Sequence, residues 1–373
     1  MKKIIVLALC LVMLLGVAAL TSACTPKTET YELALITDIG TINDKSFNQG
    51  AWEGLEKYAQ EFDKTYKYYQ PLEKTTDAYV STIELAITGG AKVIVTPGFL
   101  FEPAIYAVQD LYPEITFILL DGIPNNGDYS NFVSKVSDNT YSIFYAEEQA
   151  GFLAGYAAVK DGYTKLGFMG GMAVPAVVRY GYGFVQGANY AATEMSLADG
   201  AIDMNYFYKG DFNASPEAQA KAASWYTGGT EIIFGCGGAV GNSVMTAAEA
   251  ATKKVIGVDV DQSAESVTVV TSSMKMLGNS VYDALTAYYA NTFPGGESVV
   301  LDAADDAVGL PNNFTKFTTF NKAAYDVIFA KLVANEITIS KDVVTGTTTA
   351  ITIEEINTAA TKVDVTFEAT PEA

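Results

Sequence analysis

Short apolar runs alternate along this chain with segments of helical periodicity, and this alternation constrains the fold more than any other feature. Residues 31–37, 93–96 and 116–120 are apolar runs that end at polar residues or proline, as buried strands do. Between the first two, the apolar residues of 46–62 recur at spacings of three and four, which is typical of an amphipathic helix. Strands that alternate with helices predict parallel sheets covered on both faces, so we expect an α/β protein.

The same order of strands and helices occurs twice, before and after about residue 137. In the second part we expect strands at 165–169, 204–208, 231–234, 255–258 and 267–271, and helices at 141–159, 175–195, 216–226, 242–252 and 275–290. Two such units predict two doubly wound parallel-sheet lobes. Near the C-terminus, a helix over 322–334 and a hairpin within 337–367 are expected.

The N-terminal residues have the layout of a secretory signal peptide. Lys2-Lys3 form a short basic head, residues 4–20 an apolar middle, and small residues lead to Cys24. Because small residues before a cysteine resemble a lipobox, we predict that residues 1–23 are removed, that Cys24 is acylated, and that 24–30 form a tether. The alternatives are plain secretion and an uncleaved anchor, since the apolar run is about long enough to span a bilayer.

The composition argues against several classes of function. A formal net charge of −20 and a single arginine, Arg179, argue against binding nucleic acid through its phosphates. The chain has no histidine, which removes the usual nucleophile pairs and histidine metal ligands, so we expect no enzyme, no metal and no cofactor. Cys10 leaves with the signal peptide and Cys24 would carry lipid, so Cys236 is alone and no intramolecular disulfide is expected.

Aspartate directly follows three of the predicted strands, at Asp38, Asp121 and Asp259. Ligands of parallel sheets bind at the carboxyl ends of the strands, so these side chains can face one crevice between two lobes. The alternative is that each aspartate only closes a turn or caps the helix that follows, which is common in such loops. The residues alone leave both interpretations open.

The loop after the first strand combines an aromatic ring with amides and carboxylates. Phe47 stands at the start of a helix, near Asp38 and Asn48, and a ring in such surroundings suits a flat heterocycle. Equally, Phe47 can be the first residue of the apolar stripe of that helix. Ser46 and Gln49, three residues apart, predict a capping box at the helix start.

Residues 234–242 form a glycine-rich turn between a predicted strand and a predicted helix. Such a turn can hold a phosphate on its backbone N–H groups. However, its spacing matches neither the dinucleotide fingerprint nor a P-loop, so we expect close approach of the backbone to a neutral ligand. Cys236 within the turn is expected to be a buried structural thiol, because no histidine can activate it.

The segment 37–54, Thr-Asp-Ile-Gly-Thr-Ile-Asn-Asp-Lys-Ser-Phe-Asn-Gln-Gly-Ala-Trp-Glu-Gly, closely resembles the opening of the basic membrane protein (BMP) family, the nucleoside-binding lipoproteins of bacterial ABC importers. Further stretches resemble the family at 117–121, 146–157, 179–184, 232–241, 256–262 and 271–275. The resemblance runs from about residue 31 to 332 and implies a type I periplasmic-binding fold with three crossings between lobes and a hinge. One departure is Ala239, where the family more often has a hydroxyl residue.

The same resemblance implies a set of ligand-binding residues. Phe47 and Phe212 would stack on opposite faces of a nucleoside base. The polar contacts implied are Asp38, Asn48 and Asp121 on the first lobe, and Gly238, Asp259 and Lys275 on the other side or at the hinge.

The function implied is that of an extracytoplasmic receptor, lipid-anchored at the cell membrane, which captures a nucleoside, above all a purine one, and delivers it to an ABC permease. Rival interpretations are a sugar or signalling solute in the same fold, a surface sensor, and an acid-rich hydrolase. The expected first lobe is 31–137 plus 267–310, and the second is 138–266 plus 311–335. Residues 336–373 are expected to form a C-terminal extension to which the sequence assigns no packing.

Overall fold

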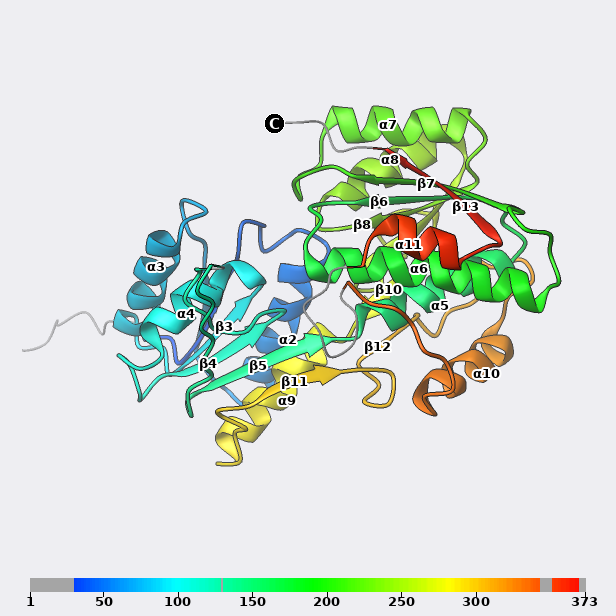
Figure 1. Ribbon diagram of the computed structural model, residues 1–373. Coiled ribbons are helices and arrows are strands. Elements are labelled where there is room, and N and C mark those ends of the chain that lie inside the picture. Colours follow the sequence, from blue (N-terminus) through cyan, green and yellow to red (C-terminus); the bar gives the residue numbers. More distant parts are fainter. Residues whose placement is uncertain (1–29, 129, 343–350, 369–373) are drawn as a thin grey trace, which may run out of the picture.

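The computed structural model describes residues 30–128, 130–342 and 351–368. The predictions for the signal peptide, Cys24 and nearly all of the tether lie outside these residues. Within the described part of the chain, no helix is both long enough and apolar enough to cross a membrane. The chain forms two lobes, each a mostly parallel sheet between helices (Figure 1), so the α/β fold expected from the sequence is confirmed.

The first lobe is built on a six-stranded sheet of order β11-β5-β4-β3-β1-β2, in which all neighbours are parallel. Its strands are β1 (Leu33–Ile36), β2 (Tyr66–Tyr69), β3 (Val93–Pro97), β4 (Thr116–Leu120), β5 (Thr140–Tyr145) and β11 (Ser298–Leu301). Its helices are α2 (Phe47–Glu61), α3 (Thr76–Thr88), the 3-10 turn η1 (Phe99–Phe101), α4 (Glu102–Val108) and α9 (Leu277–Tyr289). Alternate strand residues point to opposite faces, so Leu33 and Leu35 pack under α2 and α9, whereas Ala34 and Ile36 pack under α3 and α4.

The second lobe is built on a seven-stranded sheet of order β12-β10-β9-β8-β6-β7-β13, parallel except for β12 against β10. Its strands are β6 (Lys165–Gly170), β7 (Ile202–Tyr208), β8 (Ile232–Cys236), β9 (Lys254–Asp259), β10 (Val269–Lys275), β12 (Val308–Gly309) and β13 (Val363–Glu368). Its helices are α5 (Glu147–Lys160), α6 (Pro175–Glu194), α7 (Pro216–Thr227), α8 (Val240–Ala251), α10 (Lys322–Val333) and α11 (Ile353–Ala359). Phe168 and Phe234 face α5 and α6, while Met169 and Ile233 face α7 and α8.

Three crossings join the lobes, from β5 to α5, from β10 to α9 and from β11 to β12. The expected lobe boundaries differ from these sheets in two main places. Residues 141–145, expected to begin a helix of the second lobe, lie in β5, which pairs with β4 in the first sheet. Residues 269–275, expected in the first lobe, form β10 and pair with β9 in the second sheet. The aromatic residues of β5 favour a strand, and helix α5 begins only with the acidic turn at Glu147.

Helices α5 and α6 pack closely because glycines lie where they touch. A Cβ at Gly155 would lie 2.1 Å from a backbone oxygen of α6, and a Cβ at Gly183 would lie 2.1 Å from a backbone oxygen of α5. No larger residue fits at either position without separating the helices. The close approach places Arg179 in the first turns of α6 beside Glu147 at the start of α5, with their side chains 3.5 Å apart.

The described residues of the C-terminal region, 336–342 and 351–368, add one helix and one strand to the second lobe. Helix α11 packs against α6, and β13 pairs in parallel with β7 at the edge of the sheet (Figure 1). Part of the hairpin expected within 337–367, residues 343–350, lies outside the described residues, and the described strand of that range, β13, pairs with β7. The alternating pattern of Thr and Val does predict a strand, but the partner of β13 lies more than a hundred residues earlier in the chain.

Candidate functional site

A cavity of about 610 Å³ lies between the lobes, at the carboxyl ends of strands from both sheets. Its volume is within the range of small-molecule sites, and its position is the one where α/β sheets bind ligands. All eight residues implied by the family resemblance line this cavity: Asp38, Phe47, Asn48, Asp121, Phe212, Gly238, Asp259 and Lys275. The fold thus brings them together, while their contact with a ligand stays a prediction.

Asp121 and Asp259 stand where two strands end, and both have left-handed backbone conformations, with φ values of 54° and 64°. Aspartate tolerates this region better than most residues because its short side chain can form local hydrogen bonds. The turn directs both carboxylates toward Lys275. For these two residues, closing a turn and facing the crevice are therefore compatible roles.

Lys275 is the last residue of β10 and is only 3% exposed. Its Nζ donates a hydrogen bond to Asp121 and lies 3.5 Å from Glu147 Oε1 and 3.8 Å from Asp259 Oδ1. Burial works against the charged ammonium group, but these three carboxylates outweigh it and raise the pKa of Lys275. Burial also raises the pKa of Glu147 to about 8, against the opposing effect of Lys275. The cation and its carboxylates form one buried charge network.

Asp44 caps helix α2. Its carboxylate accepts hydrogen bonds from the backbone N–H groups of Ser46 at 2.9 Å, Asn48 at 2.9 Å and Gln49 at 3.1 Å. The capping box expected between Ser46 and Gln49 is wrong, because Asp44 already binds the N–H groups that such a box would use. The hydroxyl of Ser46 instead donates to Asp259, which links the first lobe to the second.

Asp38 and Asn48 form a fixed polar pair on the first lobe. Asn48 Nδ2 donates to Asp38 Oδ1 and to Asp44 Oδ2, each at 2.9 Å, and its Oδ1 accepts from the Asp38 N–H at 3.2 Å. Burial raises the pKa of Asp38 to about 6, although the Gly40 N–H and Asn48 oppose the shift. With all these groups held by hydrogen bonds, this wall of the cavity is organised without a ligand.

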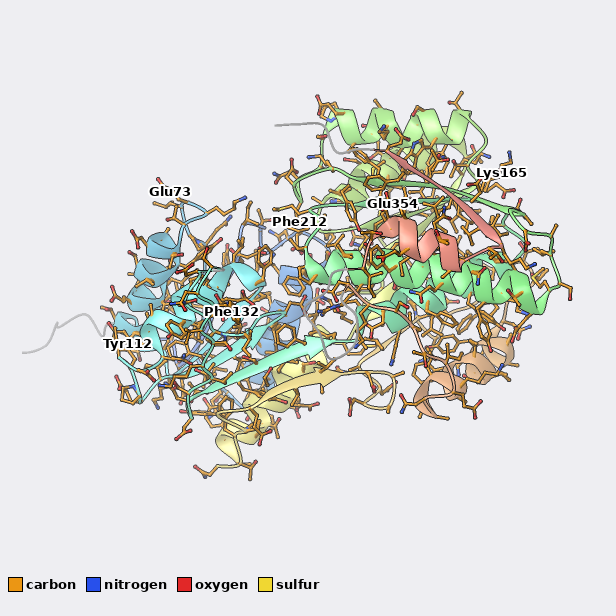
Figure 2. The ribbon with its side chains drawn as sticks, in the orientation of Figure 1. Glu73, Tyr112, Phe132, Lys165, Phe212 and Glu354 are labelled. Carbon is orange, nitrogen blue, oxygen red and sulfur yellow. The ribbon has the colours of Figure 1, made fainter. Side chains whose placement is uncertain are left out.

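The two phenylalanines reach the cavity from different lobes. Phe47 begins α2, and its ring centre lies 4.6 Å from Lys275 Nζ, within the range of a cation–π contact. Phe212 follows β7, on the side of the second lobe that faces the first (Figure 2). A Cβ at Gly171 would lie 2.4 Å from the Phe212 ring, and one at Gly237 would lie 3.1 Å from it. These glycines of the second lobe therefore leave room for Phe212, a role that the sequence did not suggest.

Sequence reasoning missed the cavity residues that helices, longer loops and strand β5 supply. They include Phe99, Glu102, Asn125, Phe132, Phe144, Glu147, Arg179 and Tyr180. Tyr180 donates a hydrogen bond of 3.3 Å to Asp259, so it extends the charge network into α6. One signal was available, since Arg179 is the single arginine of the chain and falls within a stretch that resembles the family.

The groups in the cavity are suited to binding a small polar ligand. Burial raises the pKa of the Cys236 thiol well above its usual range, so this thiol stays protonated and is a poor nucleophile. Among the residues that the structure describes, no cluster of three or more His, Cys, Asp or Glu could hold a metal ion. The arrangement instead offers aromatic surfaces and hydrogen-bonding groups.

Known proteins are similar to this chain in sequence and in fold. A family described as ABC transporter substrate-binding protein PnrA-like matches residues 31–342. The nucleoside-binding ABC transporter protein BmpA of Lactococcus lactis subsp. cremoris is 29% identical over 325 residues, which cover 80% of this chain and 87% of the relative. The CD4+ T-cell-stimulating antigen of Listeria monocytogenes is 30% identical over 302 residues, covering 75% of this chain and 80% of that protein.

Among solved structures, an ABC transporter solute-binding protein from Aeropyrum pernix K1 superimposes with a TM-score of 0.67 at 21% identity, covering 88% of this chain and 85% of that one. At this identity the likeness concerns the fold alone, and it agrees with the type I periplasmic-binding fold. The matched family and the relative from Lactococcus lactis are both described as binding proteins of ABC transporters. On the match over residues 31–342, the chain belongs to the Bmp family of ABC transporter substrate-binding proteins.

Proposed function

We propose that this protein captures a nucleoside, above all a purine one, in the cavity between its lobes and delivers it to an ABC permease. The observation that carries the proposal is the placement of Phe47 and Phe212, which line one cavity from different lobes. Two aromatic rings on opposite sides of a cavity suit a planar base, because offset stacking adds about 0.5–1.5 kcal/mol per pair beyond the area buried. We propose that closure about the hinge brings the two rings onto opposite faces of the base.

Hydroxyl groups of a ribose would satisfy acceptors that the protein leaves without hydrogen bonds. Asp121 Oδ1 and Glu147 Oε2 are buried and have no hydrogen-bond partner, although Glu147 Oε2 lies 3.5 Å from the Arg179 guanidinium. A buried acceptor without a donor costs about 1–3 kcal/mol, so a ligand that donates two hydroxyl groups gains from both. The proposed contacts with the sugar are Asp121, Asp259, Lys275 and Glu147.

The charge of the cavity wall favours an uncharged ligand over an anionic one. Its acidic side chains are Asp38, Asp44, Glu102, Asp121, Glu147 and Asp259, whereas its basic side chains are Arg179 and Lys275. Both basic side chains are already paired with carboxylates. A nucleoside carries no phosphate, so it avoids repulsion from the carboxylates.

The proposal extends to the place of action. We propose that residues 1–23 are a signal peptide and that acylated Cys24 holds the protein on the extracytoplasmic face of the cell membrane. The relative from Lactococcus lactis, named as a nucleoside-binding protein of an ABC transporter, supports both the ligand and the permease as partners. A chain that acts beside a permease is well served by a lipid anchor with two acyl chains, since two chains hold firmly where one does not.

The stacking role is tested with two phenylalanine variants of residues 25–373, purified free of bound ligand and titrated with adenosine, guanosine and inosine by calorimetry. Phe47→Ala should weaken the affinity for the best nucleoside about tenfold or more, because it removes a stacking surface in the cavity. Phe62→Ala, at the far end of the same helix and 46% exposed, is the control and should bind as the wild type does. Equal affinities of the wild type and Phe47→Ala would refute the proposed stacking.

A further inference from the structure

A short segment near the C-terminus lies against the helices that bring Glu147 and Arg179 to the cavity. Ser340 and Gln186 of α6 exchange two hydrogen bonds, of 2.8 and 3.0 Å. Lys341 Nζ lies 2.8 Å from the buried Glu148 of α5. The next residue, Asp342, binds Arg179. These contacts fix residues 340–342 on both helices at once.

The bond between Asp342 and Arg179 uses most of the guanidinium group. Arg179 Nε donates to Asp342 Oδ1 at 2.8 Å, and Nη2 donates to Oδ2 at 3.2 Å. This is the bidentate geometry in which arginine recognises carboxylates and phosphates most strongly. The remaining nitrogen, Nη1, lies 3.5 Å from Glu147 Oε2. The Arg179 side chain lines the cavity, yet both of its polar sides face carboxylates of the protein.

The pairing continues into the ligand cavity. Glu147 Oε1 lies 3.5 Å from Lys275 Nζ, which in turn binds Asp121. Asp342, Arg179, Glu147, Lys275 and Asp121 therefore form one continuous series of alternating acidic and basic side chains, which runs from the C-terminal segment to the centre of the site. Asp342 stands at the outer end of this series of side chains, on a segment that belongs to neither sheet.

We propose that Asp342 is a specificity-determining residue, which occupies the Arg179 guanidinium and so prevents it from binding an anionic form of the ligand. An arginine fork in a small-molecule cavity would otherwise attract a phosphate group. With Asp342 in place, the cavity has no unpaired cation among the described residues that line it, and it selects an uncharged solute. The inference deepens the proposed function and adds the rejection of phosphorylated nucleosides to it.

The experiment compares Asp342→Asn with the wild type in affinity for a nucleoside and for its 5′-monophosphate. The variant keeps the shape of the side chain but removes its charge and one of its two acceptors, so Nη2 loses its partner and the guanidinium is no longer neutralised by Asp342. The ratio of the two affinities should therefore shift about tenfold toward the monophosphate, as expected for one charge-assisted hydrogen bond. In an Arg179→Gln background the same substitution should leave the ratio unchanged. Asp342→Glu, which restores a carboxylate, should recover most of the wild-type ratio.

A matched control separates this effect from general loosening of the C-terminal region. Asp199→Asn removes the ion pair of Lys362, which also ties that region to the second lobe but does not involve the cavity. It should leave the affinity ratio as in the wild type. If Asp342→Asn and Asp199→Asn change both affinities alike, Asp342 has only a structural role and the inference is wrong.

A second readout does not depend on nucleoside binding. Millimolar inorganic phosphate should raise the melting temperature of Asp342→Asn but not that of the wild type or of the double variant with Arg179→Gln. If the wild type binds no nucleoside, the proposed function fails, yet this phosphate effect still decides the role of Asp342. Absence of the phosphate effect in Asp342→Asn, together with an unchanged affinity ratio, overturns the inference alone.

Discussion

Replacing Lys275 by methionine removes the central cation of the buried network while keeping much of the volume of the side chain. The ammonium group is paired with Asp121, Glu147 and Asp259, and the residue is 3% exposed. Removing one partner of a buried ion pair typically costs about 3–5 kcal/mol, because the remaining charges lose their compensation. The unfolding entropy is about 2.1 cal/mol/K per residue. Dividing the lost free energy by this entropy, summed over a chain of this length, gives a melting temperature that is lower by roughly 4–7 °C.

The pH dependence of this loss distinguishes charge from packing. Without Lys275 the neighbouring carboxylates repel one another. Burial already raises the pKa values of Glu147 and Asp259, so protonation of these two groups relieves the cost as the pH falls. Thermal unfolding of Lys275→Met and the wild type, followed by circular dichroism at pH 8 and pH 5, should therefore show a smaller difference at pH 5. Lys322→Met, which breaks an exposed pair with Asp326, is the control and should melt as the wild type does at both values. An equal loss at both pH values would refute the electrostatic reasoning.

Three further predictions concern the wild-type charges and packing. Burial raises the pKa of Glu147 from 4.5 to about 8 in the folded state, so the folded state binds the proton more tightly than the unfolded state and stability should fall as the pH rises from about 4.5 to 8. In Glu147→Gln, the melting temperature should depend less on pH over this range. Asp161 Oδ1 accepts hydrogen bonds from three consecutive N–H groups of residues 318–320, so Asp161→Ala, which removes the acceptor, should lower the unfolding free energy in urea by about 1–3 kcal/mol, and a smaller loss would contradict this. Gly171→Ala would place a Cβ 2.4 Å from the Phe212 ring, so calorimetry should find weaker ligand binding with little change in melting temperature.

The sequence predicted most of the strands and helices that lie in the two cores, because their apolar periodicity follows directly from burial on one or both faces. It missed β2, whose Tyr66–Tyr69 run contains a lysine and is mostly exposed, so it lacks the apolar signature of a buried strand. It also merged β5 with the helix after it, since both are apolar and no glycine or proline separates them. The partner of β13 could not be predicted, because pairing with β7 depends on tertiary contacts rather than on local pattern.

The site residues that lie in recognisable sequence motifs were predicted, whereas those that reach the cavity only through the packing of helices were missed. The eight residues taken from the family resemblance all line the cavity. Glu147 and Arg179 were missed because charged residues in the first turns of helices ordinarily face solvent, and Glu147 suits the helix dipole without any further role. Only the close contact of α5 with α6 brings Arg179 beside Glu147, whose carboxyl group also lies beside Lys275.

Recognition of a nucleoside in the cavity can be tested by a thermal-shift screen of residues 25–373. The protein is freed of bound ligand and heated with nucleosides, free bases, ribose and common sugars. At about a hundred times its dissociation constant, a ligand stabilises the folded state by roughly 2.7 kcal/mol, which is readily measured. We expect the melting temperature to rise with one or more purine nucleosides, and to rise less or not at all with the base or ribose alone. A shift with a sugar and none with any nucleoside would contradict this expectation.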